Sequence, residues 1–224
     1  MNKKEVVGSM SESSGVLKDL FRQINDGSIE LEQVQSFLEH KNPFIDFLSD
    51  WQNFYQKVFK VVPDFSNLKI PKKKQGFTRL IIVAERMSPH YLYNTCCTEM
   101  LCSMHLGKNL NEVVQSERTS KRRPYAVWVR DRVEADKELK NLSVEDLKER
   151  KIIGITLEER LLYELKYFRE TGKHLDVHNV TLCSGSLYSD GRAVPSVYWR
   201  GSLHIDGDGL RAHENAFRSR RVVL

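Results

Sequence analysis

Helical patterns and strand patterns occupy different parts of this chain, and this separation constrains its fold more than any other feature. Residues 16–60 carry apolar residues at helical spacing. From residue 174 onward the pattern changes to short apolar runs separated by Gly, Ser and Asp-Gly turn signals, namely VHNVTLC, PSVYWRG, SLHID and RRVVL. A chain with helices at one end and strands at the other is predicted to belong to the α+β class.

The first part of the chain predicts a compact three-helix unit over residues 16–60, preceded by a mobile tail at residues 1–15 that is rich in Ser, Gly and charge. Ser28 is the expected N-cap of the second helix. That helix is acidic, with Glu30, Glu32 and Glu39 on its exposed face. Because a recognition helix must approach phosphates, this charge argues against a DNA-binding helix-turn-helix and favours a structural or protein-docking unit.

Residues 77–224 predict a mixed α/β domain that ends in an antiparallel sheet. FTRLIIVAERM is typical of a buried strand, and Ser88-Pro89 after it begins a helix that we expect to run towards Gly107. YAVWVRD predicts a second strand. The mixed-charge segment RVEADKELKNLSVEDLKERK after it predicts a solvated helical pair with Ser143 as an N-cap. The best-defined helix begins at Thr156, which forms a capping-box pattern with Glu159, and ends at Gly172.

The composition is that of a globular chain with one sizeable core, since 40% of the residues are hydrophobic. Its apolar runs are far shorter than the roughly 20 residues that span a bilayer, and the N-terminus lacks the apolar stretch of a secretory signal. We therefore expect a soluble cytoplasmic protein with no membrane partner. The four cysteines are too few to suggest a disulfide framework, so reduced thiols are expected.

Positive charge is concentrated in the middle of the chain. Residues 71–124 hold ten Lys and Arg against four Asp and Glu, whereas the whole chain carries a net charge of +5. Such a segment favours contact with nucleic acid or with an acidic protein. The residues predicted to make this contact, from the middle segment and the tail, are Lys72, Lys73, Lys74, Arg118, Lys121, Arg122, Arg123, Arg218, Arg220 and Arg221.

Alternating His and Asp residues raise a second hypothesis, a divalent metal site in the C-terminal sheet. His174, Asp176 and His178 would share one face of a strand, and His204 and Asp206 alternate in the same way. Same-face residues of one strand lie about 7 Å apart, so these side chains could bind one ion only if the two sets met on neighbouring strands. In that case the chain would be a metal-dependent enzyme, with hydrolysis as a possible reaction.

Other nucleophiles and ligands fit simpler interpretations. Cys96, Cys97 and Cys102 lack the CxxC knuckle of a zinc site and are expected to pack as small hydrophobic residues. Ser184 and Ser186 flank Gly185 without the second glycine and following helix of a nucleophile elbow. The sequence therefore predicts only a polar loop there.

Three blocks, YAVWVRDRVEADKELKNL, GITLEERLLYELKYFRETGKHLD and RSRRVV, resemble a group of short, uncharacterised bacterial proteins. The resemblance covers mainly residues 124–183 and the tail. It implies a bacterial origin and carries no activity, cofactor or catalytic residue. The residues themselves favour a non-enzymatic binding protein without a cofactor, with the metal-dependent enzyme as the alternative.

Overall fold

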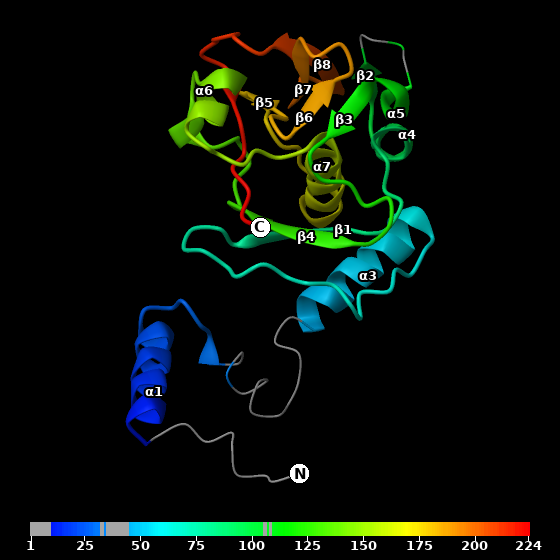
Figure 1. The fold of residues 1–224 in the computed structure, drawn as a ribbon. Coiled ribbons are helices and arrows are strands. Elements are labelled where there is room, and N and C mark those ends of the chain that lie inside the picture. The colour runs from blue at the N-terminus through cyan, green and yellow to red at the C-terminus, as the bar shows by residue number, and fades with distance from the viewer. Residues whose placement is uncertain (1–9, 32–33, 35–44, 105–106, 108) are drawn as a thin grey trace. The chain divides into compact units, whose positions relative to one another are not determined.

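The computed structural model describes residues 10–31, 34, 45–104, 107 and 109–224. The chain divides into two compact units, Met1–Asp50 and Trp51–Leu224. Helix α1 (Met10–Asn25) starts within the predicted tail, and α3 (Ile45–Phe59) spans the boundary between the units (Figure 1). Most of the helix expected after Ser28 lies outside the described residues. Helices and separate sheets together confirm the α+β class.

Helix α7 (Leu157–Thr171) lies at the centre of the second unit (Figure 1). The predicted capping box is present, since the Thr156 hydroxyl accepts from the backbone of Glu159 and the Glu159 carboxylate accepts from that of Thr156. Gly172 ends the helix in the left-handed conformation, also as predicted. All ten residues from 157 to 166 are buried, because the helix packs against other elements on every side.

Two of these elements are α4 (Pro89–Glu99) and a two-stranded ribbon of β1 (Arg79–Val83) and β4 (Tyr125–Val129). Both strands and the Ser88 N-cap of α4 confirm the sequence predictions. The Tyr55 hydroxyl fastens α3 to this ribbon. It donates to the Ile82 carbonyl at 2.8 Å and accepts from the Ala84 amide at 2.9 Å, so its buried polar atom is fully used.

The C-terminal strands form a five-stranded sheet in the order β2-β8-β7-β5-β9. The strands β5 (Val180–Leu182), β7 (Ala193–Trp199) and β8 (Leu203–Gly209) pair antiparallel, as predicted. The edge strands β2 (Cys102–Met104) and β9 (Phe217–Arg218) were not expected and pair in parallel with β8 and β5.

The helix expected to run from Ser88 towards Gly107 is shorter than predicted. α4 ends at Glu99, and Met100 is an extended C-cap. Residues 102–104 instead pair with residues 203–205, a hundred residues further along the chain. A pattern within a short window cannot contain that partner, so the local helical interpretation was wrong at this point.

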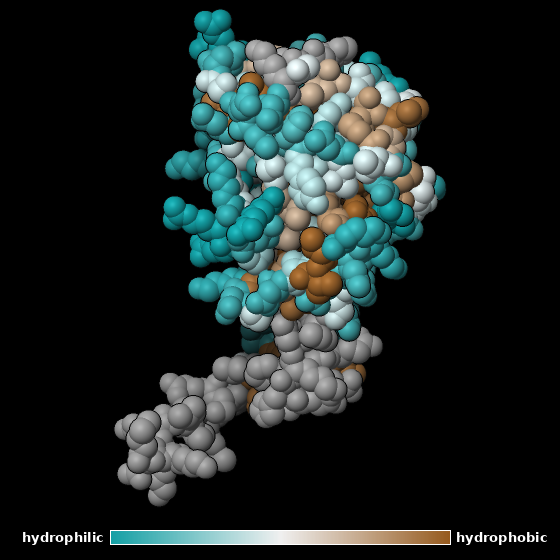
Figure 2. All heavy atoms as spheres, turned by 90° about the vertical axis from the view of Figure 1, so that its right-hand side faces the viewer, coloured by the Kyte–Doolittle hydropathy of each residue, from teal (hydrophilic) through white to brown (hydrophobic). Residues whose placement is uncertain are grey.

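Two further parts of the fold contribute residues to the pocket described below. β3 (Val114–Ser116), which follows the short helix α5 (Leu110–Val113), pairs antiparallel with β6 (Ser186–Tyr188). The 3-10 helix η1 (Lys137–Leu139) and helix α6 (Val144–Glu149) occupy the mixed-charge segment, and Ser143 caps α6 as predicted. None of the helices in the described ranges has the length and apolar character needed to cross a membrane. The face shown in Figure 2 carries mostly hydrophilic side chains, with smaller hydrophobic areas between them.

Candidate functional site

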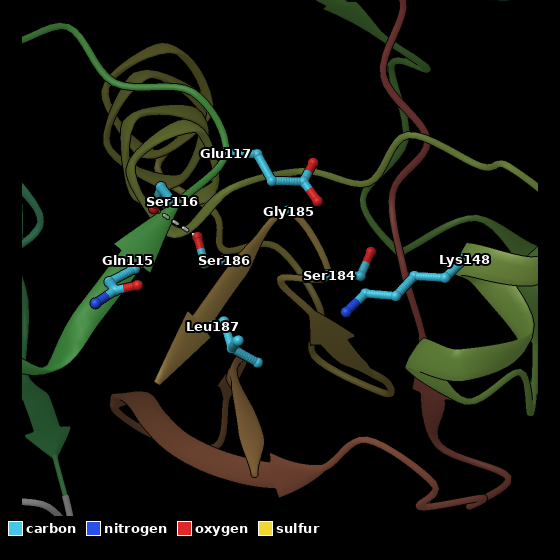
Figure 3. Close-up of a pocket in the computed structure, with 8 residues that line it drawn as sticks. All are labelled: Gln115, Ser116, Glu117, Lys148, Ser184, Gly185, Ser186 and Leu187. Atoms are coloured by element: carbon cyan, nitrogen blue, oxygen red, sulfur yellow. Dashed lines mark hydrogen bonds between the residues drawn. The ribbon is translucent and has the colours of Figure 1, made fainter. Parts of the chain in front are cut away.

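A pocket of about 260 Å³ opens where the β3–β6 pair meets the beginning of α7 (Figure 3). Three of its lining side chains are serines, one is a lysine and one is a glutamate. The complete lining is Gln115, Ser116, Glu117, Lys148, Ser184, Gly185, Ser186 and Leu187.

Ser116 and Ser186 face each other across the β3–β6 ladder. They are directly opposite in the antiparallel register, which puts their side chains on the same face. Their hydroxyl oxygens are 2.7 Å apart, and Figure 3 shows this hydrogen bond at the pocket wall. Both hydroxyls are therefore held by the backbone of the sheet rather than by a flexible loop.

The first turn of α7 supplies a carboxylate to this pair. Ser116 Oγ donates to Glu158 Oε2 at 2.7 Å, and the Leu157 amide donates to Ser186 Oγ at 2.9 Å. When Glu158 is ionised, the single proton of Ser116 goes to its carboxylate, so Ser186 donates the bond between the serines. The result is a directed chain from the Leu157 amide through Ser186 and Ser116 to Glu158.

Glu158 is only 4% exposed. Burial raises the pKa of its carboxyl to about 7, while the hydrogen bond from Ser116 opposes this shift. This carboxyl therefore exchanges its proton much closer to neutral pH than an ordinary glutamate does. A group that gains and releases a proton near the working pH is what general acid-base catalysis requires.

Arg118 fixes the loop after β3 against the same helix turn. Its Nε and Nη2 atoms lie 2.8 and 2.9 Å from the two carboxylate oxygens of Glu159, and Nη2 also donates to the Gly154 carbonyl. This two-point contact determines how Ser116, two residues before Arg118, is placed relative to Glu158.

Two glycines allow the pocket walls to approach each other. A Cβ atom at Gly154 would lie 1.8 Å from Ser184 Oγ, and one at Gly185 would lie 2.6 Å from the Gly154 carbonyl oxygen. The Gly185 amide donates to the Ile155 carbonyl at 3.0 Å, which holds the loop of residues 184–186 against the start of α7. The polar loop predicted around Gly185 is therefore a wall of the pocket.

The predicted nucleic-acid-binding residues separate into two classes. Arg118 is partly buried and forms an ion pair with Glu159, and Arg220 is fully buried and forms one with Asp176. Arg218 is half-buried and donates to the Ala135 carbonyl. These three guanidinium groups are structural in this fold. The seven others are exposed, namely Lys72, Lys73, Lys74, Lys121, Arg122, Arg123 and Arg221.

The predicted metal ligands of the C-terminal sheet do not meet. β7 lies between β5 and β8, so the segment of residues 174–178 before β5 is not beside His204 and Asp206 on β8. Over the described residues, no three His, Cys, Asp or Glu side chains are grouped to hold a metal ion.

The residues of this metal hypothesis have other neighbours. Asp176 is fully buried and accepts from Arg160 at 2.9 Å and from Arg220 at 2.8 Å. His174 bonds to the buried Glu164 and stacks on Trp199, whereas His178 is exposed.

On β8, Asp206 accepts from the Tyr198 hydroxyl at 2.6 Å, and the ring of His204 stacks on that of Tyr198. These contacts join two adjacent strands of the sheet and stabilise it.

Sequence reasoning did not single out Ser116 and Glu158 as candidate functional residues. Ser116 stands alone in its segment, and Glu158 resembles an ordinary acidic residue in the first turn of a helix. The burial of α7 on every side, which raises the pKa of Glu158, is a tertiary property. Comparison of the chain with protein-family models, curated proteins and solved structures returned no match.

Proposed function

We propose that this chain is a hydrolase that cleaves small polar esters or amides by acyl transfer through Ser116, with Glu158 as general base. One observation carries the proposal. A hydroxyl at the wall of an open pocket donates, at 2.7 Å, to a buried carboxylate. Nucleophile and base within hydrogen-bonding distance, with the base held by a rigid element, are the arrangement that activates a serine.

In the first step the Ser116 proton moves to Glu158 Oε2 as Oγ bonds to the substrate carbonyl carbon. The carbonyl then re-forms, and the leaving group departs with the proton from Glu158. In the second step water gives a proton to Glu158 and attacks the acyl carbon, and the proton returns to Ser116 Oγ. Ser186 donates to Oγ throughout and stabilises the negative charge that develops there.

The size of the pocket supports a small substrate. Its volume of about 260 Å³ is near the lower limit of roughly 300 Å³ for sites that enclose drug-sized ligands. Serine, glutamine, glutamate and lysine side chains line it, with Leu187 as the aliphatic member. The polar members of this lining offer hydrogen-bond partners to a polar group of the substrate.

Hydrolysis of 4-nitrophenyl acetate by the purified chain tests the proposal. We expect Ser116→Ala and Glu158→Gln each to lower kcat/KM by about 100-fold or more, because each removes one partner of the proton transfer. Ser189→Ala is the matched control, since this serine is exposed in a turn and lies outside the pocket lining. Wild-type rates in Ser116→Ala would contradict the proposal.

A second candidate function is contact with nucleic acid or an acidic protein through the seven exposed cations. Within the described part of the chain, none of these seven forms an ion pair, whereas Arg118 and Arg220 do. Uncompensated exposed charge favours polyanion binding that weakens steeply as salt rises. Charge reversal at residues 72–74 or 121–123 should reduce the salt dependence of binding to duplex DNA. Binding that does not change with salt concentration would contradict this second function.

A further inference from the structure

Lys148 is the uncompensated cation of the candidate pocket. It projects from α6, and Figure 3 shows its side chain reaching the part of the pocket wall occupied by Ser184, away from Ser116 and Ser186. Among the residues that the structure describes, none forms an ion pair or side-chain hydrogen bond with it. Arg118, in contrast, is neutralised by Glu159.

The other polar groups beside Lys148 cannot donate a proton to a ligand. Ser219 Oγ donates its proton to the Leu182 carbonyl at 2.9 Å, so the 2.8 Å contact between Ser184 and Ser219 must be donated by Ser184. Ser184 therefore presents only acceptor lone pairs to the pocket. Glu117 is also only an acceptor when ionised, and its charge lies 3.7 Å from Arg118 Nη1.

We infer that Lys148 recognises an anionic group of the substrate, so that the substrates are small esters or amides that carry a carboxylate. This inference rests on the hydrolase function proposed above and adds the substrate class. One unpaired ammonium matches one negative charge. A dianionic phosphate would leave one charge uncompensated beside Glu117, which disfavours it.

Two esters of similar length test the assignment: 4-nitrophenyl butyrate, which is neutral, and mono-4-nitrophenyl succinate, which is anionic. We expect the wild-type chain to prefer the succinate by about tenfold in kcat/KM, the usual effect of one charge-assisted hydrogen bond. The ratio of kcat/KM for the succinate to kcat/KM for the butyrate should fall to about one in Lys148→Ala and below one in Lys148→Glu. Lys140→Ala, an exposed lysine outside the pocket lining, should keep the wild-type ratio.

A preference that survives Lys148→Ala, or that is absent from the wild type, would overturn the inference and leave the hydrolase proposal intact. A binding measurement identifies the opposite case, in which Lys148 binds the anion but the chain is not a hydrolase. In the Ser116→Ala background, calorimetry should detect succinate binding that Lys148→Ala weakens by about tenfold.

If the chain binds succinate through Lys148 but hydrolyses neither ester, the hydrolase proposal alone is overturned. Inorganic phosphate is the comparison ligand, and phosphate binding tighter than succinate would overturn the assignment to a carboxylate.

Discussion

Arg118 and Glu159 join the loop after β3 to the first turn of α7 through two parallel hydrogen bonds of 2.8 and 2.9 Å. Glu159 is fully buried and the Arg118 side chain is only 13% exposed. Their neighbours in the chain, Ser116 and Glu158, form the bond on which the proposed chemistry depends. The ion pair thus positions the proposed catalytic pair while remaining outside the pocket lining.

Arg118→Ala should lower the free energy of unfolding by about 3 kcal/mol, because it leaves a buried carboxylate without its counter-charge. Urea unfolding measures the loss. Arg122→Ala, which removes an exposed cation from the same loop, should change stability by less than about 0.5 kcal/mol. Equal effects of the two substitutions would show that Arg118 is not the structural group described here.

Gly154→Ala should destabilise the fold by about 1 to 3 kcal/mol, because its Cβ would overlap Ser184 Oγ. The second substitution Ser184→Ala should recover part of the loss, since it removes the overlapping atom. Unfolding free energies of the two single variants and the double variant form a cycle that measures the coupling. Additive effects would contradict the close approach of these two segments.

Asp176→Asn should destabilise the fold by about 3 to 5 kcal/mol. The carboxylate compensates two buried guanidinium groups, of Arg160 and Arg220, and the amide that replaces it carries no charge. The left-handed backbone at this residue, with φ of 53°, is tolerated by Asn as well as by Asp, so the substitution isolates the charge. If Asp176 were instead a metal ligand, added ion would raise the stability of the chain that retains Asp176. Thermal unfolding with and without added Zn²⁺ distinguishes these cases.

Stability should fall as pH rises from about 4.5 to about 7 through the titration of Glu158. Burial raises the pKa of this carboxyl from its ordinary 4.5 to about 7, so in this range the folded chain keeps a proton that the unfolded chain has lost. The contribution is on the order of 3 kcal/mol and should be absent from Glu158→Gln. Unfolding free energies of both chains at pH 4 and pH 8 give the difference, and parallel pH profiles would contradict it.

The sequence alone was sufficient to predict features whose signals lie within a few neighbouring residues. Ser88, Ser143 and Thr156 cap helices in the structure as their patterns predict, and Gly172 ends α7. Strand β2 could not be predicted, because its partner is β8 and not a neighbouring segment. Local patterns therefore located the capped helix starts and the end of α7, but not the end of α4, where the chain pairs with a distant strand.

The candidate site depends on contacts that no local pattern contains. Ser116 meets Ser186 across 70 residues and Glu158 across 42 residues. The net charge of a segment also does not distinguish cations that are exposed to a partner from cations that are paired within the fold. Arg118 and Arg220 are instead used to neutralise buried carboxylates, which only the fold reveals.

Acylation of Ser116 is the central claim, and intact-protein mass spectrometry with peptide mapping tests it most directly. At pH 8, with 4-nitrophenyl acetate in excess, the account predicts one acetyl group per chain, carried by Ser116 and absent from Ser116→Ala. An unmodified chain, or acetyl groups on surface lysines that persist in Ser116→Ala, would contradict it.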